Sequence, residues 1–441
     1  MSHPSHDATA RKPTTWVPTL YIAQGLPYFA VATVAMQMFK SMGLTNAEIA
    51  HWTAFLGAAW IFKPLWSPFL ELVSSKKKVV VFFQLAGAVS FGLVGLALHL
   101  PLWLGAVIAM LTLAAFSSAT HDIACDGLYI TTLDAKQQAA YAGWTGTFFN
   151  AGRVIAAGGM LLLADHFEKS MGVVPAWTIV FGLIALMMLA LGLYNSYALP
   201  QAPNLRTEAT SAKAIASTLQ EVIVDFFRKP GVWVSILFII LFRAGEAQVQ
   251  TIGPLFLRDA VSAGGLGLST GQVGKVYGTV GTVAFIVGSI GGGYFVSKLG
   301  LKRAILPLIL AVNLPNFVFW YLSTFRPDDL TLIAAALGAE MFGYGFGFVG
   351  LILYMMQVVA PGRYATAHYA FATGVMQLGQ VLFRWISGDI QTALGYQKFF
   401  VWVLISAIPV AILSQLIPMT ARTPAEGTAA DDAALSPAAS E

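Results

Sequence analysis

One stretch decides how the chain folds: LWLGAVIAMLTLAAFSSATHDIACDG, residues 102–127. Its first two thirds carries no charge, and Asp122 and Asp126 then follow, four residues apart and therefore on one face of a helix. A carboxylate inside an apolar helix costs roughly 2.5–3.5 kcal/mol on insertion scales, so it normally faces a protein interior or a watery cavity. With His121 beside them, the aspartates indicate a lined pathway. The competing interpretation is a structural pair satisfied by a buried arginine.

The composition of the chain places it in a membrane. Of the 441 residues, 57% are hydrophobic and only 10% are charged, whereas soluble domains average about 25% charged residues. Apolar runs of about twenty residues recur from end to end, which is the length an α-helix needs to cross a bilayer. A β-barrel would show short alternating segments instead. We therefore expect an all-α membrane protein. The single cysteine, Cys125, cannot form an internal disulfide.

The apolar runs predict twelve membrane-spanning helices in two six-helix bundles. The first bundle is expected over 17–198 and the second over 231–418, joined by a polar linker, 199–230, that carries an amphipathic helix. Disordered tails are expected at 1–16 and 419–441. The individual spans are expected at about 17–39, 47–72, 79–98, 102–130, 138–163, 175–198, 231–257, 271–297, 303–324, 330–359, 363–390 and 396–418.

The basic residues predict the orientation. If both ends of the chain are cytoplasmic, fifteen lysines and arginines fall on the cytoplasmic side and six on the other, in line with the positive-inside bias. No small-residue cleavage site follows a short apolar region at the start, so the first span is expected to stay uncleaved. The expected location is the inner cell membrane. The other four basic residues fall inside spans: Lys63, Arg153, Arg243 and Arg384.

The two sets of spans resemble copies of each other. A basic turn at 74–79 joins spans two and three, and a similar turn at 297–304 joins spans eight and nine. Likewise, 158–166 precedes span six much as 387–396 precedes span twelve. Two six-span halves joined by a linker form the parallel-repeat layout of secondary transporters. The alternative is that helical membrane proteins in general reuse basic turns.

This layout resembles the major facilitator superfamily. The loop GGGYFVSKLGLKR, residues 291–303, is similar to the family's signature between spans eight and nine. The resemblance implies two bundles that rock about a central site, in a protein that works as a monomer. It also implies a gating role for four residues of this loop: Lys298, Gly300, Lys302 and Arg303. The corresponding first-half loop lacks the glycines of the signature, and Glu71 is its expected acidic residue.

A narrower likeness lies in the first half. The motifs QGLP at 24–27, FKPLWSP at 62–68 and HDIACDG at 121–127 are similar to those of AmpG-type muropeptide permeases, a group that includes acetyl-CoA transporters. Arg153 falls where that group carries an arginine in span five. The resemblance implies proton-driven import of cell-wall sugar–peptide fragments.

Two residues depart from the permease pattern. His121 stands where glutamine is usual, and Leu128 where tryptophan is common. The solute therefore stays open, and a siderophore, a simple sugar or a nucleotide-linked acid are alternatives. A membrane signalling receptor or a membrane enzyme would need a soluble output domain or a nucleophile–base set, and the sequence indicates neither. The expected partners are a small-molecule substrate, protons and the lipid bilayer; no nucleic acid, metal or cofactor is expected.

Charged residues inside the first-half spans carry the transport hypothesis. Lys63, which Pro64 follows, would form a charge cluster with Asp122 or Asp126, unless its head reaches the membrane interface. Arg153 has a fixed fork of donors and suits the carboxylate or phosphate of an anionic substrate. Its structural alternative is a permanent partnership with Asp122 or Asp126.

The second half offers further charged candidates. Arg243 and Glu246 lie three residues apart and could pair along their own helix. Glu340 stands alone in its span and is a candidate proton carrier, since a buried carboxyl can hold a proton at neutral pH. Arg384 is its expected partner, although Asp389 is a simpler partner for that arginine. Four polar or aromatic residues within spans could contact a sugar: Gln24, Tyr28, Trp66 and Asn150.

Overall fold

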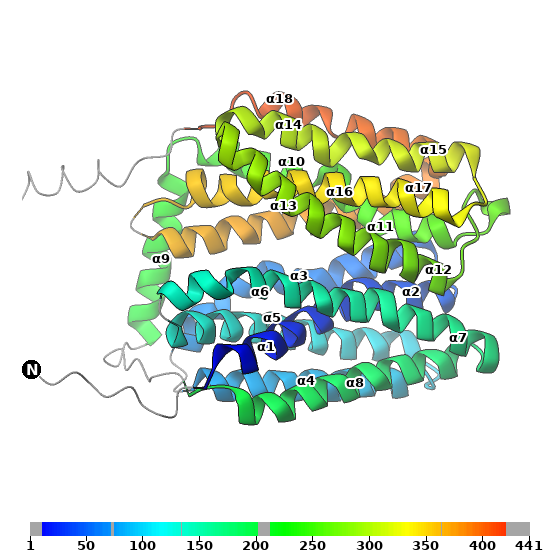
Figure 1. The fold of residues 1–441 in the computed structure, drawn as a ribbon, viewed down its shortest axis with the longest axis horizontal. Helices are drawn as coiled ribbons and strands as arrows, with labels where there is room; N and C mark the ends of the chain where they lie inside the picture. Colours follow the sequence, from blue (N-terminus) through cyan, green and yellow to red (C-terminus); the bar gives the residue numbers. More distant parts are fainter. Residues whose placement is uncertain (1–10, 72–74, 134, 202–211, 363, 420–441) are drawn as a thin grey trace, which may run out of the picture.

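The computed structural model describes residues 11–71, 75–133, 135–201, 212–362 and 364–419. Within these ranges the chain is helical and forms no strand. Long helices run side by side, and helix α9 lies across one end of the molecule, on the left of Figure 1. We call this the α9 end and the opposite one the far end. Most of the two predicted tails lies outside the described residues.

The helices of the first half follow the predicted spans. Helix α1 begins at Pro13, four residues before the expected start, because proline fits the first turn of a helix, where its missing N–H is not needed. In order the elements are α1 (Pro13–Phe29), the π-helix η1 (Ala30–Val34), α2 (Ala35–Ser41), α3 (Asn46–Glu71), α4 (Lys76–Ala97), α5 (Trp103–Thr132), α6 (Ala135–Arg153), the π-helix η2 (Val154–Met160), α7 (Leu161–Met171) and α8 (Val173–Ala198).

The linker and the second half are also helical. Helix α9 (Ala212–Arg228) occupies the place of the expected amphipathic helix. The elements that follow are α10 (Val232–Phe242), α11 (Ala244–Arg258), the 3-10 helix η3 (Val261–Ala263), α12 (Thr270–Val273), the π-helix η4 (Gly274–Val280), α13 (Gly281–Leu299), α14 (Leu301–Asn313), the 3-10 helix η5 (Leu314–Asn316), α15 (Phe317–Phe325), α16 (Leu330–Tyr354), the π-helix η6 (Met355–Val359), α17 (Ala365–Ile405) and α18 (Ile408–Leu413).

In the described ranges, ten helical segments are long and apolar enough to cross a membrane. Helix α3 is not among them, because polar residues such as His51 and Lys63 lower its hydropathy. One of the ten segments, Ala367–Leu413, contains most of helix α17 and all of helix α18. Within it, Gly395 interrupts helix α17 with φ 71° and ψ 167°, a conformation that favours glycine. The break falls where the expected spans eleven and twelve meet. The chain is a multi-pass membrane protein.

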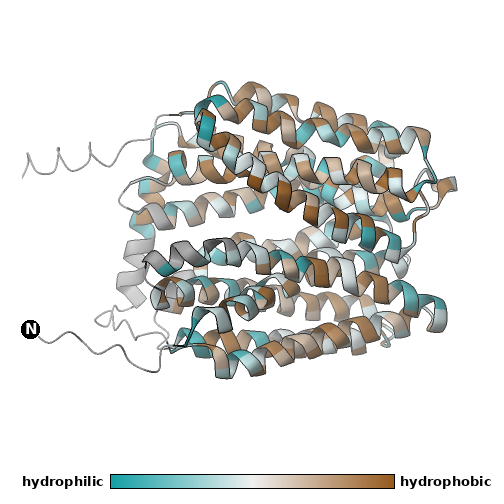
Figure 2. Ribbon diagram, in the orientation of Figure 1, coloured by the Kyte–Doolittle hydropathy of each residue, from teal (hydrophilic) through white to brown (hydrophobic). Residues whose placement is uncertain are grey.

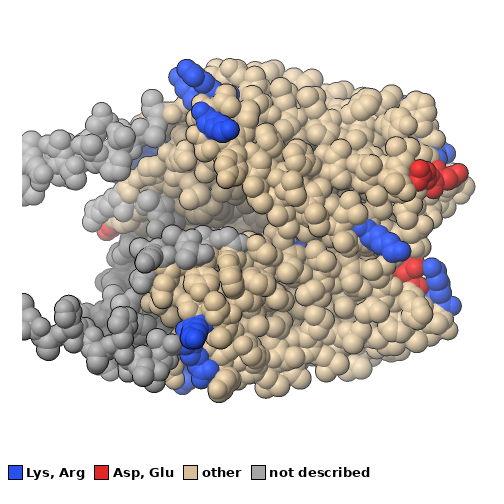
Figure 3. Space-filling model, in the orientation of Figure 1, with Lys and Arg blue, Asp and Glu red and all other residues tan. Residues whose placement is uncertain are grey.

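The surface of the molecule has the polarity that a bilayer requires. The helices are apolar over most of their length and polar toward their ends (Figure 2). On the face seen in Figure 3, charged side chains gather toward the two ends and leave an uncharged band between them. Large apolar side chains such as Phe82, Leu186 and Tyr294 are exposed. In water such a surface would be a liability, whereas the bilayer covers it.

The two halves of the chain meet through polar contacts at the far end. Lys40 of the first half lies 2.5 Å from Asp259 of the second, and Asn46 donates a hydrogen bond of 2.9 Å to Gln391. Arg258 donates to Gln37 at 3.1 Å. We call this group of contacts the far-end latch; it also includes Tyr396, which donates to Asp259, and the hydrogen bond of Thr270 to Glu168 at 3.1 Å.

A close backbone contact also joins the halves, where π-helix η2 packs against π-helix η4. A Cβ atom at Gly278 would lie 2.2 Å from the carbonyl oxygen of Ala157. Only glycine permits such an approach of two helix backbones. Helices α3 and α17 form a second, longer contact between the halves. Together these contacts hold the two halves around the cavity described next.

Candidate functional site between the two halves

A charge cluster lies within the first half, on helices α1, α3 and α5. Lys63 forms an ion pair with one carboxylate oxygen of Asp122, and Gln24 donates a hydrogen bond to the other. The side chains of Lys63 and Asp122 are partly exposed. We call Gln24, Lys63, Asp122 and Asp126 the acidic cluster. Paired charges of this kind are tolerated inside a membrane because they satisfy each other.

Asp126 lies one helical turn beyond Asp122, and its side chain is exposed. Within the described residues, the ion pair of Lys63 goes to Asp122 and not to Asp126. Asp126 is thus the more exposed carboxylate of the cluster.

His121 points away from the acidic cluster. It is buried, and its Nε2 lies 2.9 Å from Nε2 of Gln84 on helix α4. Asn195 on helix α8 donates to the same glutamine at 3.3 Å and accepts a hydrogen bond of 2.8 Å from Thr19 on helix α1. The histidine therefore belongs to a hydrogen-bonded chain that ties four helices together. The structure does not bring it to the pathway side of helix α5.

A cavity of about 320 Å³ lies between the two halves. Its volume is at the lower end of the range for ligand pockets. Elements of both halves line it, from η1 and α6 on one side to α11, η4, α16 and α17 on the other. The polar and aromatic lining includes Tyr28, Phe29, Phe149, Asn150, Arg153, Arg243, Gln250, Tyr277, Phe285, Tyr344, Gln377, Gln380 and Arg384.

One of the three arginines of this cavity is neutralised. Arg243 lies 2.9 Å from the carboxylate of Glu246, three residues along the chain, and donates to the hydroxyl of Tyr344 at 3.3 Å. Both charged side chains are almost fully buried. Helix α10 ends at Phe242 and α11 begins at Ala244, so the pair sits at a helix break. Such breaks are common at the binding sites of transporters.

The other two arginines have no such partner. Arg153 and Arg384 are 8% and 7% exposed, and in the described part of the chain no carboxylate lies within 4.0 Å of either. The guanidinium of Arg153 lies over the rings of Phe29, Phe285 and Tyr277 at 5.5, 5.8 and 6.0 Å. A desolvated cation–π contact stabilises an arginine by about 2 kcal/mol. It leaves the fork of N–H donors available for an anion.

Three pairings that the sequence left open are not formed. Arg153 contacts neither aspartate of the acidic cluster, because its side chain lies among the aromatic rings of the cavity. Arg384 forms no ion pair with Glu340 or with Asp389, which instead lies 2.9 Å from His51 at the far end. Glu340 is buried, one of its oxygens has no hydrogen-bond partner, and its charge interacts with those of Arg153 and Glu246.

The expected sugar-contacting residues divide between the two places. Tyr28 and Asn150 line the cavity, and Gln24 belongs to the acidic cluster. Trp66 packs against Phe116, with ring centroids 5.4 Å apart. The uncharged lining residues Tyr277 and Tyr344 were not expected, because aromatic residues are common throughout membrane spans and their sequence context gives no sign of the face they occupy.

The expected gating loop lies at the α9 end. Gly300, with φ 75°, forms the turn between helices α13 and α14, and Lys298, Lys302 and Arg303 around it are exposed. Glu71 ends helix α3, and its side chain lies outside the described residues. The described residues of the loop thus present basic charge to the surface.

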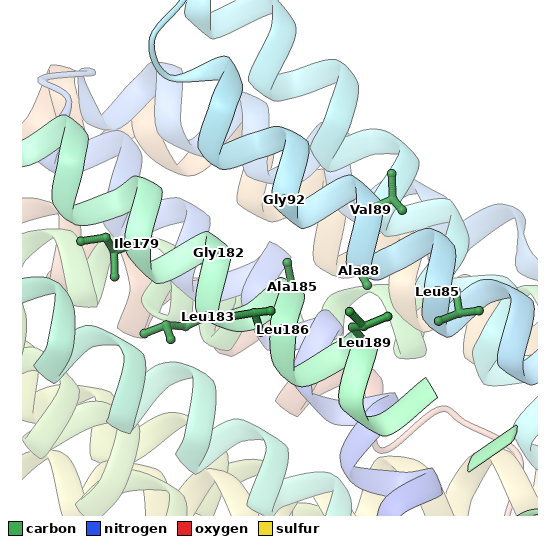
Figure 4. Close-up of a pocket in the computed structure, with 10 residues that line it drawn as sticks. All are labelled: Leu85, Ala88, Val89, Gly92, Ile179, Gly182, Leu183, Ala185, Leu186 and Leu189. Carbon is green, nitrogen blue, oxygen red and sulfur yellow. The ribbon is translucent and has the colours of Figure 1, made fainter. Parts of the chain in front are cut away.

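A second, larger hollow is unsuited to a polar solute. It measures about 710 Å³ and lies between helices α4 and α8 (Figure 4). Its lining consists of apolar residues and glycines such as Leu85, Gly92 and Leu189, and several of them are exposed on the membrane-facing surface. The cavity between the halves is therefore the candidate site.

Apolar helices surround a charged cavity, and the far-end latch closes the molecule at one end. These features define the class of the protein as a membrane transporter of small molecules. The family model described as Major Facilitator Superfamily matches residues 19–384. The chain belongs to this superfamily.

Curated relatives agree with the family. The chain is 26% identical over 403 residues to the anhydromuropeptide permease of Escherichia coli (strain K12), in a match that covers 89% of this chain and 77% of the relative. It is 23% identical to the putative transporter AmpG 4 of Rickettsia felis, with 88% and 92% of the two chains covered. The chain resembles the AmpG-type permeases, as its first-half motifs predict.

Solved structures share the fold. A D-xylose–proton symporter has a TM-score of 0.69 at 14% identity, with 92% of this chain and 97% of that chain covered. The nucleoside transporter NupG has a TM-score of 0.64 at 16% identity, with 91% and 97% covered. The prediction of a transporter of the major facilitator class is confirmed.

Proposed function

We propose that the protein is a proton-coupled importer of a muropeptide-like sugar–peptide, with twelve spans in two six-helix bundles that work by alternating access. The observation that carries this proposal is the cavity between the halves, lined by three buried arginines and by aromatic rings. Such a lining complements a solute that has both anionic groups and sugar rings.

The relative from Escherichia coli supports the choice of substrate, since it is named as an anhydromuropeptide permease. The cavity of about 320 Å³ would enclose only part of a sugar–peptide. The remainder would extend along helix α6 toward the α9 end, where Trp144, Gly146 and Asp126 are exposed. We propose that the peptide part projects from the cavity in this direction.

The acidic cluster supports proton coupling. Asp126 is exposed, while Asp122 is held by Lys63 and Gln24. Protonation of either aspartate would change the pairing of Lys63 and thereby the preferred conformation of the first half. Each proton that enters with a membrane potential of 100 mV contributes about 2.3 kcal/mol, which is roughly fiftyfold in solute accumulation.

The orientation follows from the basic residues. Helices α4, α9 and α14 carry lysines and arginines at the α9 end, as at Lys76, Arg228 and Lys302. By the positive-inside bias this end is cytoplasmic, in the inner membrane of a bacterium. The far-end latch then closes the outer side, and the described conformation faces the cytoplasm. The working unit is a monomer.

The proposal is tested by uptake of radiolabelled anhydromuropeptide into cells that lack their own permease and express this chain. We expect accumulation that disappears when a protonophore collapses the proton gradient. No uptake above the empty-vector strain would reject the substrate, and uptake unaffected by the protonophore would reject the coupling. A panel of siderophores, sugars and nucleotide-linked acids in the same cells distinguishes the alternative solutes.

A further inference from the structure

The charges that line the central cavity do not balance. Arg243 is paired with Glu246 at 2.9 Å, which leaves Arg153 and Arg384 as the cations without a carboxylate within 4.0 Å among the described residues. Both are more than nine-tenths buried, and Nε of Arg384 has no hydrogen-bond partner. Glu340 interacts with Arg153 at longer range, but a buried cation without a carboxylate in direct contact is costly, so this arrangement favours a ligand that supplies negative charge.

The two unpaired arginines come from different halves of the molecule. Arg153 ends helix α6 of the first half, and Arg384 lies within helix α17 of the second. Both line the same cavity of about 320 Å³, and a carboxylate can accept N–H···O bonds of about 2.7–2.9 Å from more than one donor. One anionic group bound in this cavity therefore meets an arginine of each half on its walls.

The surroundings of Arg153 fix its guanidinium without using its donors. Phe29 of the first half and Tyr277 and Phe285 of the second lie around it, with ring centroids 5.5–6.0 Å away. The flat faces of these rings attract the cation, while the in-plane N–H groups stay free for a planar acceptor. An arginine prepared in this way loses little entropy when an anion arrives.

We propose that Arg153 and Arg384 form a clamp for one anionic group of the transported solute, each arginine acting from its own half, and that this clamp makes a carboxylate or phosphate obligatory for recognition. The inference rests on the transporter function proposed above and specifies its substrate class. A solute whose acid is converted to an amide loses the group that joins the halves, whatever its sugar or peptide part.

The test is equilibrium binding to the purified full chain, with two matched pairs of probes. The first pair is 1,6-anhydro-N-acetylmuramic acid and its carboxamide; the second is glucuronic acid and glucuronamide. Wild type is expected to bind at least one acid about 10- to 100-fold more tightly than its amide, the usual gain from charged hydrogen bonds. Arg153→Gln and Arg384→Gln should each remove this preference by weakening acid binding far more than amide binding, and a wild-type elution profile in size-exclusion chromatography shows that the variants are folded.

A double-mutant cycle tests whether one group is shared. If both arginines hold the same anion, Arg153→Gln with Arg384→Gln should weaken acid binding little more than either alone, because contacting partners are not additive. Arg153→Lys should restore part of the preference by its charge. The exposed Lys398→Gln removes a positive charge elsewhere and is the matched control.

The clamp is rejected if no acid is preferred over its amide, if the preference survives in either single variant, or if the two losses multiply. Arginine-dependent preference for glucuronic acid, with no binding of the anhydromuramic pair, would support the clamp and count against the muropeptide substrate. The two proposals can therefore fail separately.

Discussion

The acidic cluster and the central cavity differ in the balance and in the exposure of their charged side chains. In the cluster, carboxylates outnumber the cation, and Lys63, Asp122 and Asp126 retain access to water. In the cavity, arginines outnumber the paired carboxylate, and Arg153 and Arg384 are almost sealed. Hydrated carboxylates can exchange protons, whereas arginine cannot deprotonate and suits a lasting anion contact. We therefore propose that the proton binds in the first region and the solute in the second.

The largest effect that would break this division is expected from Asp126→Asn. The amide cannot take up a proton, so transport should lose its coupling, and accumulation should fall from about fiftyfold per proton at 100 mV to about one. Accumulation ratios in energised vesicles measure this. Binding of the acid probe should stay within about twofold of wild type, because Asp126 lies outside the cavity lining. Loss of binding together with accumulation would place the solute at the cluster.

A second test concerns the one neutral pair of the cavity. Glu246→Gln leaves Arg243 as a third buried cation without a counter-ion, which costs roughly 3–5 kcal/mol. We expect thermal unfolding in detergent to begin several degrees lower than in wild type. The acid probe should restore more stability in this variant than in wild type, since it supplies the missing charge. An unchanged unfolding temperature would show that Glu246 does not stabilise the buried charge of Arg243.

The far-end latch should respond weakly to substitution and hardly at all to mild acid. Burial alone would raise the pKa of Asp259, but hydrogen bonds from Lys40, Tyr396 and Asn46 lower that pKa below its usual value. Such a carboxylate contributes stability above its usual pKa and loses it only as the pH falls through the lowered value. The latch therefore stays intact between about pH 5 and 8, and pH dependence of transport there arises elsewhere.

Asp259→Asn should open the far end in roughly twofold to fivefold more molecules, as expected for a partly exposed ion pair. Spin labels on cysteines at Ser170 and Lys398, both exposed at that end, measure the distance between the halves. The native Cys125 is buried and stays unlabelled. His51 of the first half also lies 2.9 Å from Asp389 of the second, so the same measurement is made in His51→Gln. A pH-dependent distance between pH 5 and 8 that persists in that variant would contradict the lowered pKa of Asp259.

The smallest effect is expected from His121→Gln. A glutamine can keep a hydrogen bond to Gln84 and so preserve the chain that ties four helices together. We expect uptake within about twofold of wild type, since the exchange retains a neutral hydrogen bond. Uptake with a changed pH profile would instead give this histidine a part in proton transfer.

How much could be predicted from the sequence depended on whether a feature is local. Apolar runs located most of the long helices, and spacing alone predicted the pair of Arg243 and Glu246. The spacing could also have predicted that His121 points away from Asp122, since successive residues of a helix point about 100° apart. The partners of Arg153 were beyond such reasoning. They depend on how η4 and α13 of the other half are rotated, and no pattern within α6 records that rotation.

The π-helix η2 has a consequence for variation along the chain. A π-turn holds about one residue more than an α-turn. Deleting a single residue from Val154–Met160 can therefore be absorbed by turning the π-turn into an α-turn, which leaves the orientation of helix α7 nearly unchanged. Glu168 would then keep its hydrogen bond of 3.1 Å with Thr270. The same deletion in the regular part of helix α7, before Glu168, would turn that residue by about 100° and break the contact.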